Sequence, residues 1–123
     1  MEVSGLHHVS MLVSDTARAL AFYEGVLGIE VDGGRPDLGF PGAWLNVGSA
    51  QIHLLELPNP DPTHGRPAHG GRDRHVALTV RDVAAVAAAL ERAGIEYTRS
   101  RSGRAALFCR DPDGNALELV EVG

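Results

Sequence analysis

The sequence contains no lysine: all of its 11 basic residues are arginine, against 16 aspartate and glutamate residues. The formal net charge of −5 argues against a nucleic-acid partner, because phosphate binding requires clustered positive charge. No apolar run approaches the roughly 18 residues that a membrane span needs. The opening segment, MEVSGLHHVSMLV, lacks the basic start and unbroken apolar stretch of a signal peptide. We therefore expect a cytoplasmic protein without a membrane or nucleic-acid partner.

Cysteine and aromatic residues are also scarce. Cys109 is the only cysteine, so no disulfide can form within the chain, and we interpret it as a buried packing residue rather than a nucleophile. Aromatic residues make up 5% of the chain, so no stacking pocket is evident, although Trp44, Phe40 and Phe108 are candidates to line a cavity. A length of 123 residues suits one compact domain, here residues 1–123.

The chain repeats itself. The segment LHHVSMLVSD at 6–15 matches DRHVALTVRD at 73–82, and each is followed by a stretch with helical spacing of apolar residues, at 15–27 and 82–93. A glycine, Gly28 or Gly94, stands where each helix should end. His8 and His75 are 67 positions apart, the two glycines 66, and His53 and Glu118 65. Three matched landmarks make coincidence an unsatisfactory explanation.

Three β-like segments complete each half. They are GIEVD, 43–48 and 51–57 in the first half, and GIEYT, 105–110 and 116–122 in the second, with DPDGN at 111–115 as a hairpin turn. The sequence thus predicts an α+β fold of two βαβββ modules, 5–57 and 74–122. The Pro- and Gly-rich segment 58–73 joins them and is long enough to reach over a site.

Strand alternation predicts which side chains share a face. His8 and His75 lie opposite the apolar faces of their strands, at equivalent places in the repeat, and His53 and Glu118 are equivalent in the last strands. His7 belongs to the opposite face. A carboxylate on an inward face, with no cation predicted beside it, is costly to bury, and a metal ion removes that cost. A lone strand histidine usually bonds a backbone carbonyl, but four matched donors predict a site for Zn, Ni, Co, Fe or Mn at His8, His53, His75 and Glu118.

Two groups of residues in or next to the linker have alternative interpretations. Arg66, Arg72 and Arg74 fall within nine residues, and such a patch can bind a small carboxylate or phosphate and position an anionic substrate; solvated loop arginines are an equal alternative. His64 and His69 lie in the same loop, and we interpret them as solvated or as neighbours of the ligands.

The sequence resembles those of the vicinal oxygen chelate superfamily. This superfamily includes glyoxalase I, methylmalonyl-CoA epimerase, extradiol dioxygenases, fosfomycin-resistance transferases and bleomycin-binding proteins. The resemblance covers residues 5 to 122 and rests on LHHVSMLVSD, AFYEGVLGIEV, RHVALTV and DPDGNALELVE. It implies paired βαβββ modules in a cupped mixed sheet around a metal, with His8, His53, His75 and Glu118 at the ligand positions. Glyoxalase I enzymes usually have a carboxylate where this chain has His53.

The resemblance implies a metal-dependent lyase, isomerase or epimerase that acts on a small vicinal-oxygen substrate through an enediolate-like intermediate, with Glu118 as the catalytic base. An extradiol-type Fe(II) dioxygenase and a non-catalytic drug-binding resistance protein are the alternatives. Short, open strands leave edges for a second chain to cover, so we expect a homodimer with twofold symmetry. The site is built either within one chain or across two, and the sequence defines neither the substrate nor the metal.

Overall fold

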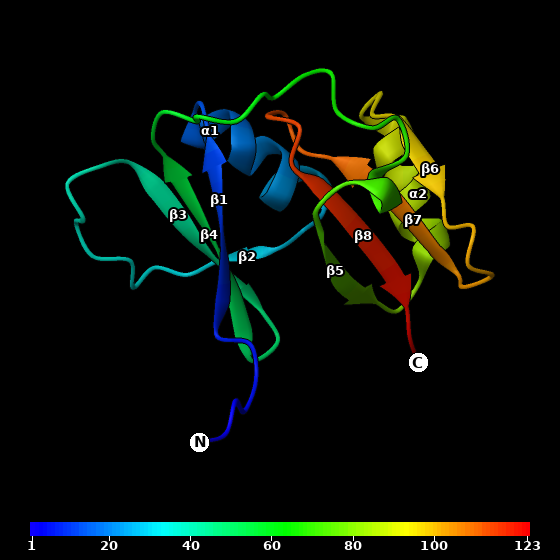
Figure 1. Ribbon diagram of the computed structural model, residues 1–123, viewed down its shortest axis with the longest axis horizontal. Helices are drawn as coiled ribbons and strands as arrows, with labels where there is room; N and C mark the ends of the chain where they lie inside the picture. Colours follow the sequence, from blue (N-terminus) through cyan, green and yellow to red (C-terminus); the bar gives the residue numbers. More distant parts are fainter.

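The first half of the chain forms one βαβββ module. The computed structural model describes all 123 residues (Figure 1). Helix α1 is short and continues directly as a π-helical segment, η1, so that the two together span the helix predicted at 15–27. The elements are β1 (His8–Val13), α1 (Thr16–Leu20), η1 (Ala21–Val26), β2 (Glu30–Val31), β3 (Gly42–Val47) and β4 (Ala50–Glu56).

The second half repeats this order, after a linker that contains the short 3-10 helix η2 (Gly70–Arg72). Its elements are β5 (His75–Val80), α2 (Val83–Arg92), β6 (Tyr97–Arg99), β7 (Ala106–Arg110) and β8 (Ala116–Glu121). The sheets have equivalent strand orders, β1-β4-β3-β2 and β5-β8-β7-β6, in which the first pair is parallel and the others antiparallel. The predicted α+β fold of two βαβββ modules is confirmed; each module forms its own four-stranded sheet, and neither sheet closes into a barrel.

The repeated sequence signals form equivalent local structures. The carboxylates of Asp15 and Asp82 accept hydrogen bonds from backbone N–H groups in the first turns of α1 and α2, as N-caps do. Gly28 and Gly94 have φ angles of 69° and 70°, the left-handed conformation that ends a helix and that glycine adopts without strain. None of the helices has the length and apolar character needed to cross a membrane.

The segment DPDGN forms the predicted hairpin turn between β7 and β8. One carboxylate oxygen of Asp111 accepts from the backbone N–H groups of Asp113 and Asn115, each at 2.9 Å. Gly114 has a φ of 84°, and a Cβ there would lie 2.5 Å from the carbonyl oxygen of Thr63. This glycine therefore allows the linker to approach the turn closely.

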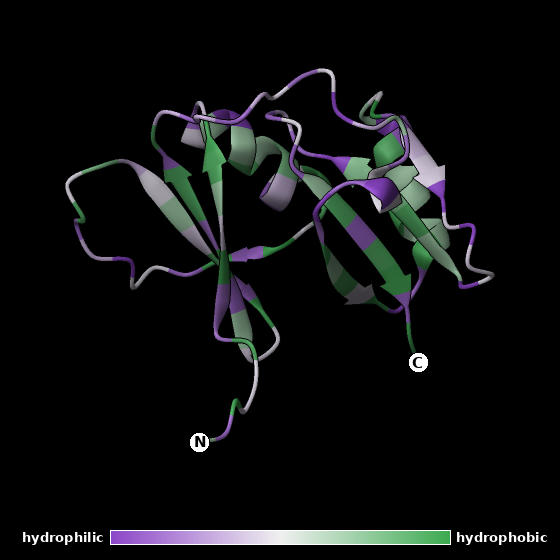
Figure 2. Ribbon diagram, viewed as in Figure 1, coloured by the Kyte–Doolittle hydropathy of each residue, from purple (hydrophilic) through white to green (hydrophobic).

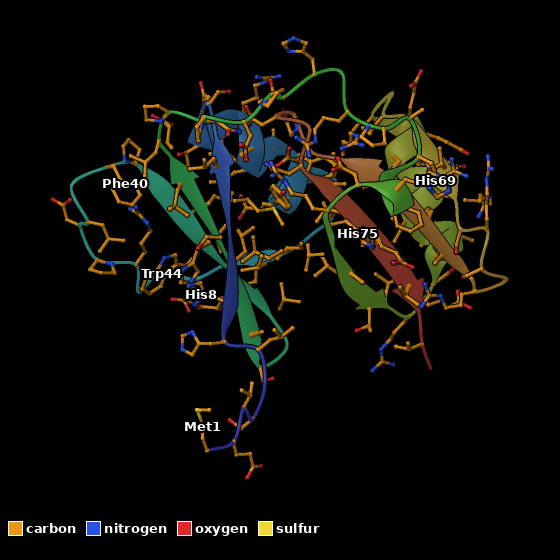
Figure 3. The ribbon with its side chains drawn as sticks, in the orientation of Figure 1. Met1, His8, Phe40, Trp44, His69 and His75 are labelled. Carbon is orange, nitrogen blue, oxygen red and sulfur yellow. The ribbon has the colours of Figure 1, made fainter.

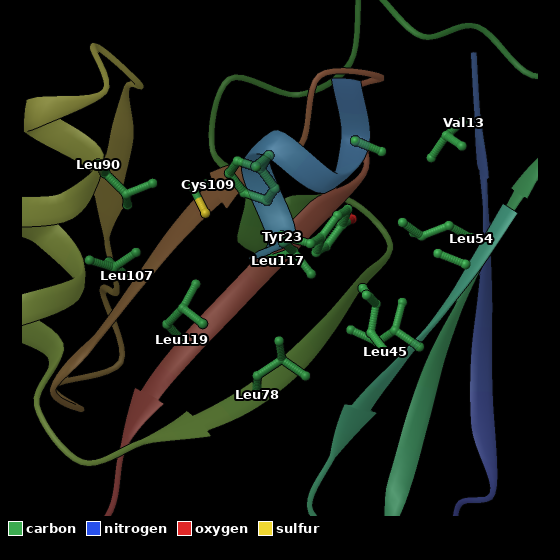
Figure 4. Packing of buried hydrophobic residues seen from close by; sticks show 14 of the residues in the cluster. Val13, Tyr23, Leu45, Leu54, Leu78, Leu90, Leu107, Cys109, Leu117 and Leu119 are labelled. Atoms are coloured by element: carbon green, nitrogen blue, oxygen red, sulfur yellow. The ribbon is translucent and has the colours of Figure 1, made fainter. Parts of the chain in front are cut away.

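The two sheets share one hydrophobic core (Figure 4). A single cluster of 16 buried residues combines Leu45, Ile52 and Leu54 of the first module with Leu107, Leu117 and others of the second. Hydrophobic colour covers much of the strands and of α2, whereas the linker is mostly hydrophilic (Figure 2). Because strand residues alternate, the faces that carry the predicted metal ligands are turned away from this shared core.

Candidate metal centre

His75 and Glu118 lie side by side on the outer face of the second sheet. Strand β5 pairs in parallel with β8, and the register sets His75 opposite Ala116 and Ala77 opposite Glu118. The Nε2 atom of His75 is 3.3 Å from Oε1 of Glu118. Two ligand atoms at about 2.1 Å from one zinc ion are about 3.0–3.4 Å apart at octahedral or tetrahedral angles. The spacing of this pair therefore fits two neighbouring ligands of one ion.

The backbone fixes the orientation of the His75 ring. Its Nδ1 atom is 2.8 Å from the carbonyl oxygen of Asp73, which can only accept, so Nδ1 carries a hydrogen. In the neutral ring, Nε2 then has a lone pair that faces the carboxylate of Glu118. Two acceptors at this distance attract each other only when a proton or a metal ion lies between them. The donor set thus fits a cation at this position.

Glu118 is buried, with a side chain that is 4% exposed, and it also has a cationic neighbour. The Nη2 atom of Arg104, in the loop between β6 and β7, is 3.2 Å from Oε2 of Glu118. The expectation that no cation lies beside this carboxylate is therefore wrong. Arg104 is 14 residues from Glu118 in sequence, and only the fold of the β6–β7 loop brings it there, so spacing gave no signal for it.

His8 and His53 form the corresponding pair on the outer face of the first sheet. Their rings stack with centroids 4.1 Å apart, and the other side of the His53 ring stacks on Trp44 at 4.5 Å. Partial burial, followed by the charges of neighbouring His8 and His7, lowers the pKa of His53. A lowered pKa favours the neutral ring, which is the form that binds metals.

The polar contacts of this pair define which ring nitrogens are engaged. The Nε2 atom of His53 is 2.9 Å from Oε1 of Gln51, whose amide nitrogen donates to Asp32 and Asn46. The Nδ1 atom of His8 is 2.8 Å from Nδ1 of His7. His7 was predicted to belong to the opposite face; it precedes β1 and its ring contacts that of His8.

The structure does not bring the four donors together within one chain. No group of three or more His, Cys, Asp or Glu side chains is arranged to hold a metal ion. His8 and Trp44 lie on the side of β1 that faces away from the second sheet, whereas His75 lies on β5 (Figure 3). Each chain therefore presents two half-sites, His8 with His53 and His75 with Glu118, on outward faces.

Two of the three loop arginines are paired with carboxylates. Arg66 binds both oxygens of Asp73, at 2.7 and 2.8 Å, and Arg74 is 2.9 Å from Asp61. The Arg66 guanidinium, assisted by Arg110, holds the pKa of Asp73 well below its usual range. Arg72 is exposed in η2. The structure thus gives Arg66 and Arg74 a role in shaping the linker and leaves only Arg72 of the patch without a carboxylate partner.

The linker covers part of the outer face of the second sheet, as its length allowed. A Cβ at Gly70 or Gly71 would lie 3.2 or 3.1 Å from atoms of Phe108, the strand neighbour of Glu118. The His69 ring packs on Phe108 at 5.0 Å and its Nε2 is 3.1 Å from the carbonyl oxygen of Arg99. The linker therefore forms one wall beside the His75–Glu118 half-site.

Two curated proteins are similar to this chain over most of its length. Glyoxylase I 4 of Arabidopsis thaliana is 33% identical over 97% of this chain and 71% of its own length. A lactoylglutathione lyase of Haemophilus influenzae is 28% identical over 93% of this chain and 90% of its own length.

Solved structures share the fold. A Bacillus anthracis protein assigned to the glyoxalase family superposes with a TM-score of 0.82 at 24% identity, over 100% of this chain and 98% of that one. The fosfomycin resistance protein FosX of Listeria monocytogenes superposes with a TM-score of 0.78 at 17% identity, over 99% and 94%. The model of the glyoxalase/bleomycin resistance protein/dioxygenase superfamily matches residues 5–119. The chain belongs to this superfamily.

Proposed function

We propose that this chain is a metal-dependent lyase, isomerase or epimerase of the glyoxalase type, acting on a small molecule with neighbouring oxygen atoms. The observation that carries the proposal is the contact between His75 and Glu118, 3.3 Å apart with the ring hydrogen fixed on the far side. The relatives named for glyoxalase and lactoylglutathione lyase activity support the reaction class. A cytoplasmic location remains a prediction.

The complete site, in this proposal, forms between two copies of the chain. His8 and His53 come from one copy, and His75 and Glu118 from the other, because each chain carries both half-sites on outward faces and unites them nowhere. A homodimer with a twofold axis then contains two equivalent sites. The surfaces around the half-sites, with Trp44 stacked on His53 on one side and Phe108 beside Glu118 on the other, become the walls of the substrate pocket.

The chemistry divides between the ion and Glu118. A bound divalent ion supplies a Lewis acid that polarises a carbonyl or hydroxyl oxygen of the substrate. Glu118 is the only carboxylate among the four donors, so we assign it to remove a proton from the carbon beside that oxygen and to return it. His75 keeps Glu118 directed into the site, and burial by Phe108 and the linker excludes water from the carboxylate.

Metal analysis of protein purified without added metal, followed by a screen of small oxygenated metabolites, tests the reaction. Ni, Co or Zn together with isomerase or lyase turnover supports the proposal. Oxygen-sensitive Fe(II) with ring cleavage supports the dioxygenase instead, and an absence of metal with tight drug binding supports a resistance protein.

Mixing two inactive variants tests where the site forms. His8→Ala combined with His53→Ala removes both donors of the first half-site, and Glu118→Gln removes the carboxylate of the second. Random pairing of equal amounts gives one intact site in every mixed dimer, or about one quarter of all sites. Co-expressed variants should therefore bind about a quarter of the parental metal, whereas a site within one chain regains none. A monomer at micromolar concentration in ultracentrifugation contradicts the two-copy site.

A further inference from the structure

Arg104 reaches a buried carboxylate from an exposed position. Its side chain is 60% exposed, whereas that of Glu118 is 4% exposed, and the two meet at 3.2 Å. The guanidinium is also held from behind, because its Nε donates to Ser102 Oγ at 3.0 Å, and that oxygen lies 2.8 Å from Ser100 Oγ. The β6–β7 loop thus presents one defined cation to Glu118.

The two oxygens of Glu118 have different neighbours. Oε1 faces Nε2 of His75, and Oε2 faces Arg104. Arg104 therefore does not occupy the position between His75 and Glu118, and an ion can bind there while the guanidinium remains. A bound ion and Arg104 would both interact with the single negative charge of the Glu118 carboxylate.

Other arginines do not have this relationship with a proposed ligand. Arg66 and Arg110 bind Asp73, Arg74 pairs with Asp61, and Arg99 stacks on Tyr97 at 5.6 Å. Arg101 lies in the same loop as Arg104 and is exposed. Arg101 therefore carries the same charge on the same loop but does not contact Glu118, which makes it a matched control for Arg104.

We propose that Arg104 is the counter-ion of Glu118 in the metal-free chain and that it lowers the affinity of the site for divalent metal. This inference rests on the proposed function, since it takes Glu118 as a ligand. A buried carboxylate without a partner is costly, and Arg104 removes that cost before any metal arrives. The stabilisation of the metal-free state opposes metal binding, and the guanidinium charge also repels the incoming ion. The chain thereby folds without its metal and holds it reversibly.

Zinc titration against a chromogenic chelator measures this effect without any substrate. Arg104→Ala should bind Zn²⁺ about threefold to tenfold more tightly than the parent, a range set by the exposure of the guanidinium. Arg101→Ala removes an equal charge from the same loop and should stay within about twofold of the parent. Arg104→Lys keeps the charge and should remain close to the parent. In a Glu118→Gln background, Arg104→Ala should give a smaller gain, because only the repulsion between the guanidinium and the ion is then relieved.

Thermal unfolding gives a second readout. Arg104→Ala should lower the melting temperature of the metal-free chain more than that of the zinc-loaded chain, because only the metal-free carboxylate loses its sole strong cation. Equal or weaker zinc binding by Arg104→Ala overturns the inference, as does an equal gain in Arg101→Ala. If neither the parent nor any variant binds zinc, the proposed metal site is wrong. If the parent binds zinc and Arg104→Ala binds it with the same affinity, the metal site stands and only the role of Arg104 is wrong.

Discussion

The hydroxyl group of Tyr23, in η1 of the first module, donates a 2.7 Å hydrogen bond to the carboxylate of Asp111, in the hairpin turn of the second. Both residues are buried. Asn115 adds a bond of 2.8 Å to the same oxygen and one of 3.1 Å to the carbonyl of Leu12. Burial raises the pKa of Asp111, and these hydrogen bonds partly oppose the shift. A small polar network therefore links the modules beside their apolar core.

Tyr23→Phe should destabilise the chain by about 1–3 kcal/mol, because a buried carboxylate loses one of its donors while the ring stays in place. The hydrogen bond from the Tyr23 hydroxyl stabilises the ionised form of Asp111. Without it, the pKa of Asp111 should rise further. A raised carboxyl pKa in the fold disfavours the ionised form, and the loss should therefore be larger at pH 7 than near pH 4. Urea unfolding at both pH values measures this. Tyr97→Phe, which removes an exposed bond to Glu91, is the control and should cost less than about 0.5 kcal/mol.

Arg110→Ala should destabilise the chain by about 2 kcal/mol in urea unfolding. Its guanidinium donates to Asp73 and to the carbonyls of Gly114 and Pro67, at 2.6 to 2.8 Å, and so joins the hairpin turn to the linker. Arg72→Ala removes an exposed arginine from the same linker and should change stability by less than about 0.5 kcal/mol. Equal losses in the two variants would show that the contacts of Arg110 contribute little.

Glu118→Gln should weaken metal binding strongly and abolish turnover even with metal in excess, because the site loses both its only negative charge and its base. His53→Ala should retain part of the metal, since three donors remain and water can take the open position. Plasma emission spectrometry of purified variants gives the metal content. His64→Ala is the control, because that exposed loop histidine belongs to neither half-site. His7→Ala is unsuitable for this purpose, as its ring contacts His8.

Cys109 should resist thiol reagents in the folded chain. It is 3% exposed, and burial, followed by the charge of Asp111, raises its pKa to about 12. At pH 8 the thiol is therefore protonated as well as covered, and both conditions prevent attack by the thiolate. Ellman's reagent should label it only after denaturation. Rapid labelling of the native protein at pH 8 would contradict the buried position.

The repeat made the fold predictable. Matched landmarks and helix-ending glycines identify the elements. Strand alternation also relates His75 to Glu118 and His8 to His53, which are in contact in the structure, whereas the single site predicted for all four is not formed within one chain. These are local properties of the chain, and they follow from backbone periodicity. The confirmed burial of Cys109 follows in the same way from its apolar neighbours.

Contacts made by loops were not predictable. Nothing in the spacing relates Arg104 to Glu118 or Arg66 to Asp73, because a loop's path depends on tertiary packing rather than on a repeating pattern. The arginine patch looked like a possible anion site from sequence, yet acidic neighbours neutralise Arg66 and Arg74. Face parity also cannot say whether two sheets turn their polar faces together or apart, and in this chain they are apart.

The core common to both sheets makes the two modules a single cooperative unit. A half-length chain ending near residue 57 would expose Leu45, Ile52 and Leu54, which are each about fully buried in the whole protein. The fragment's own helix packs on this sheet but does not replace the buried residues of the second module, so we expect the fragment to associate with another copy. The linker therefore holds together, within one polypeptide, two half-size units that would otherwise have to associate as separate chains.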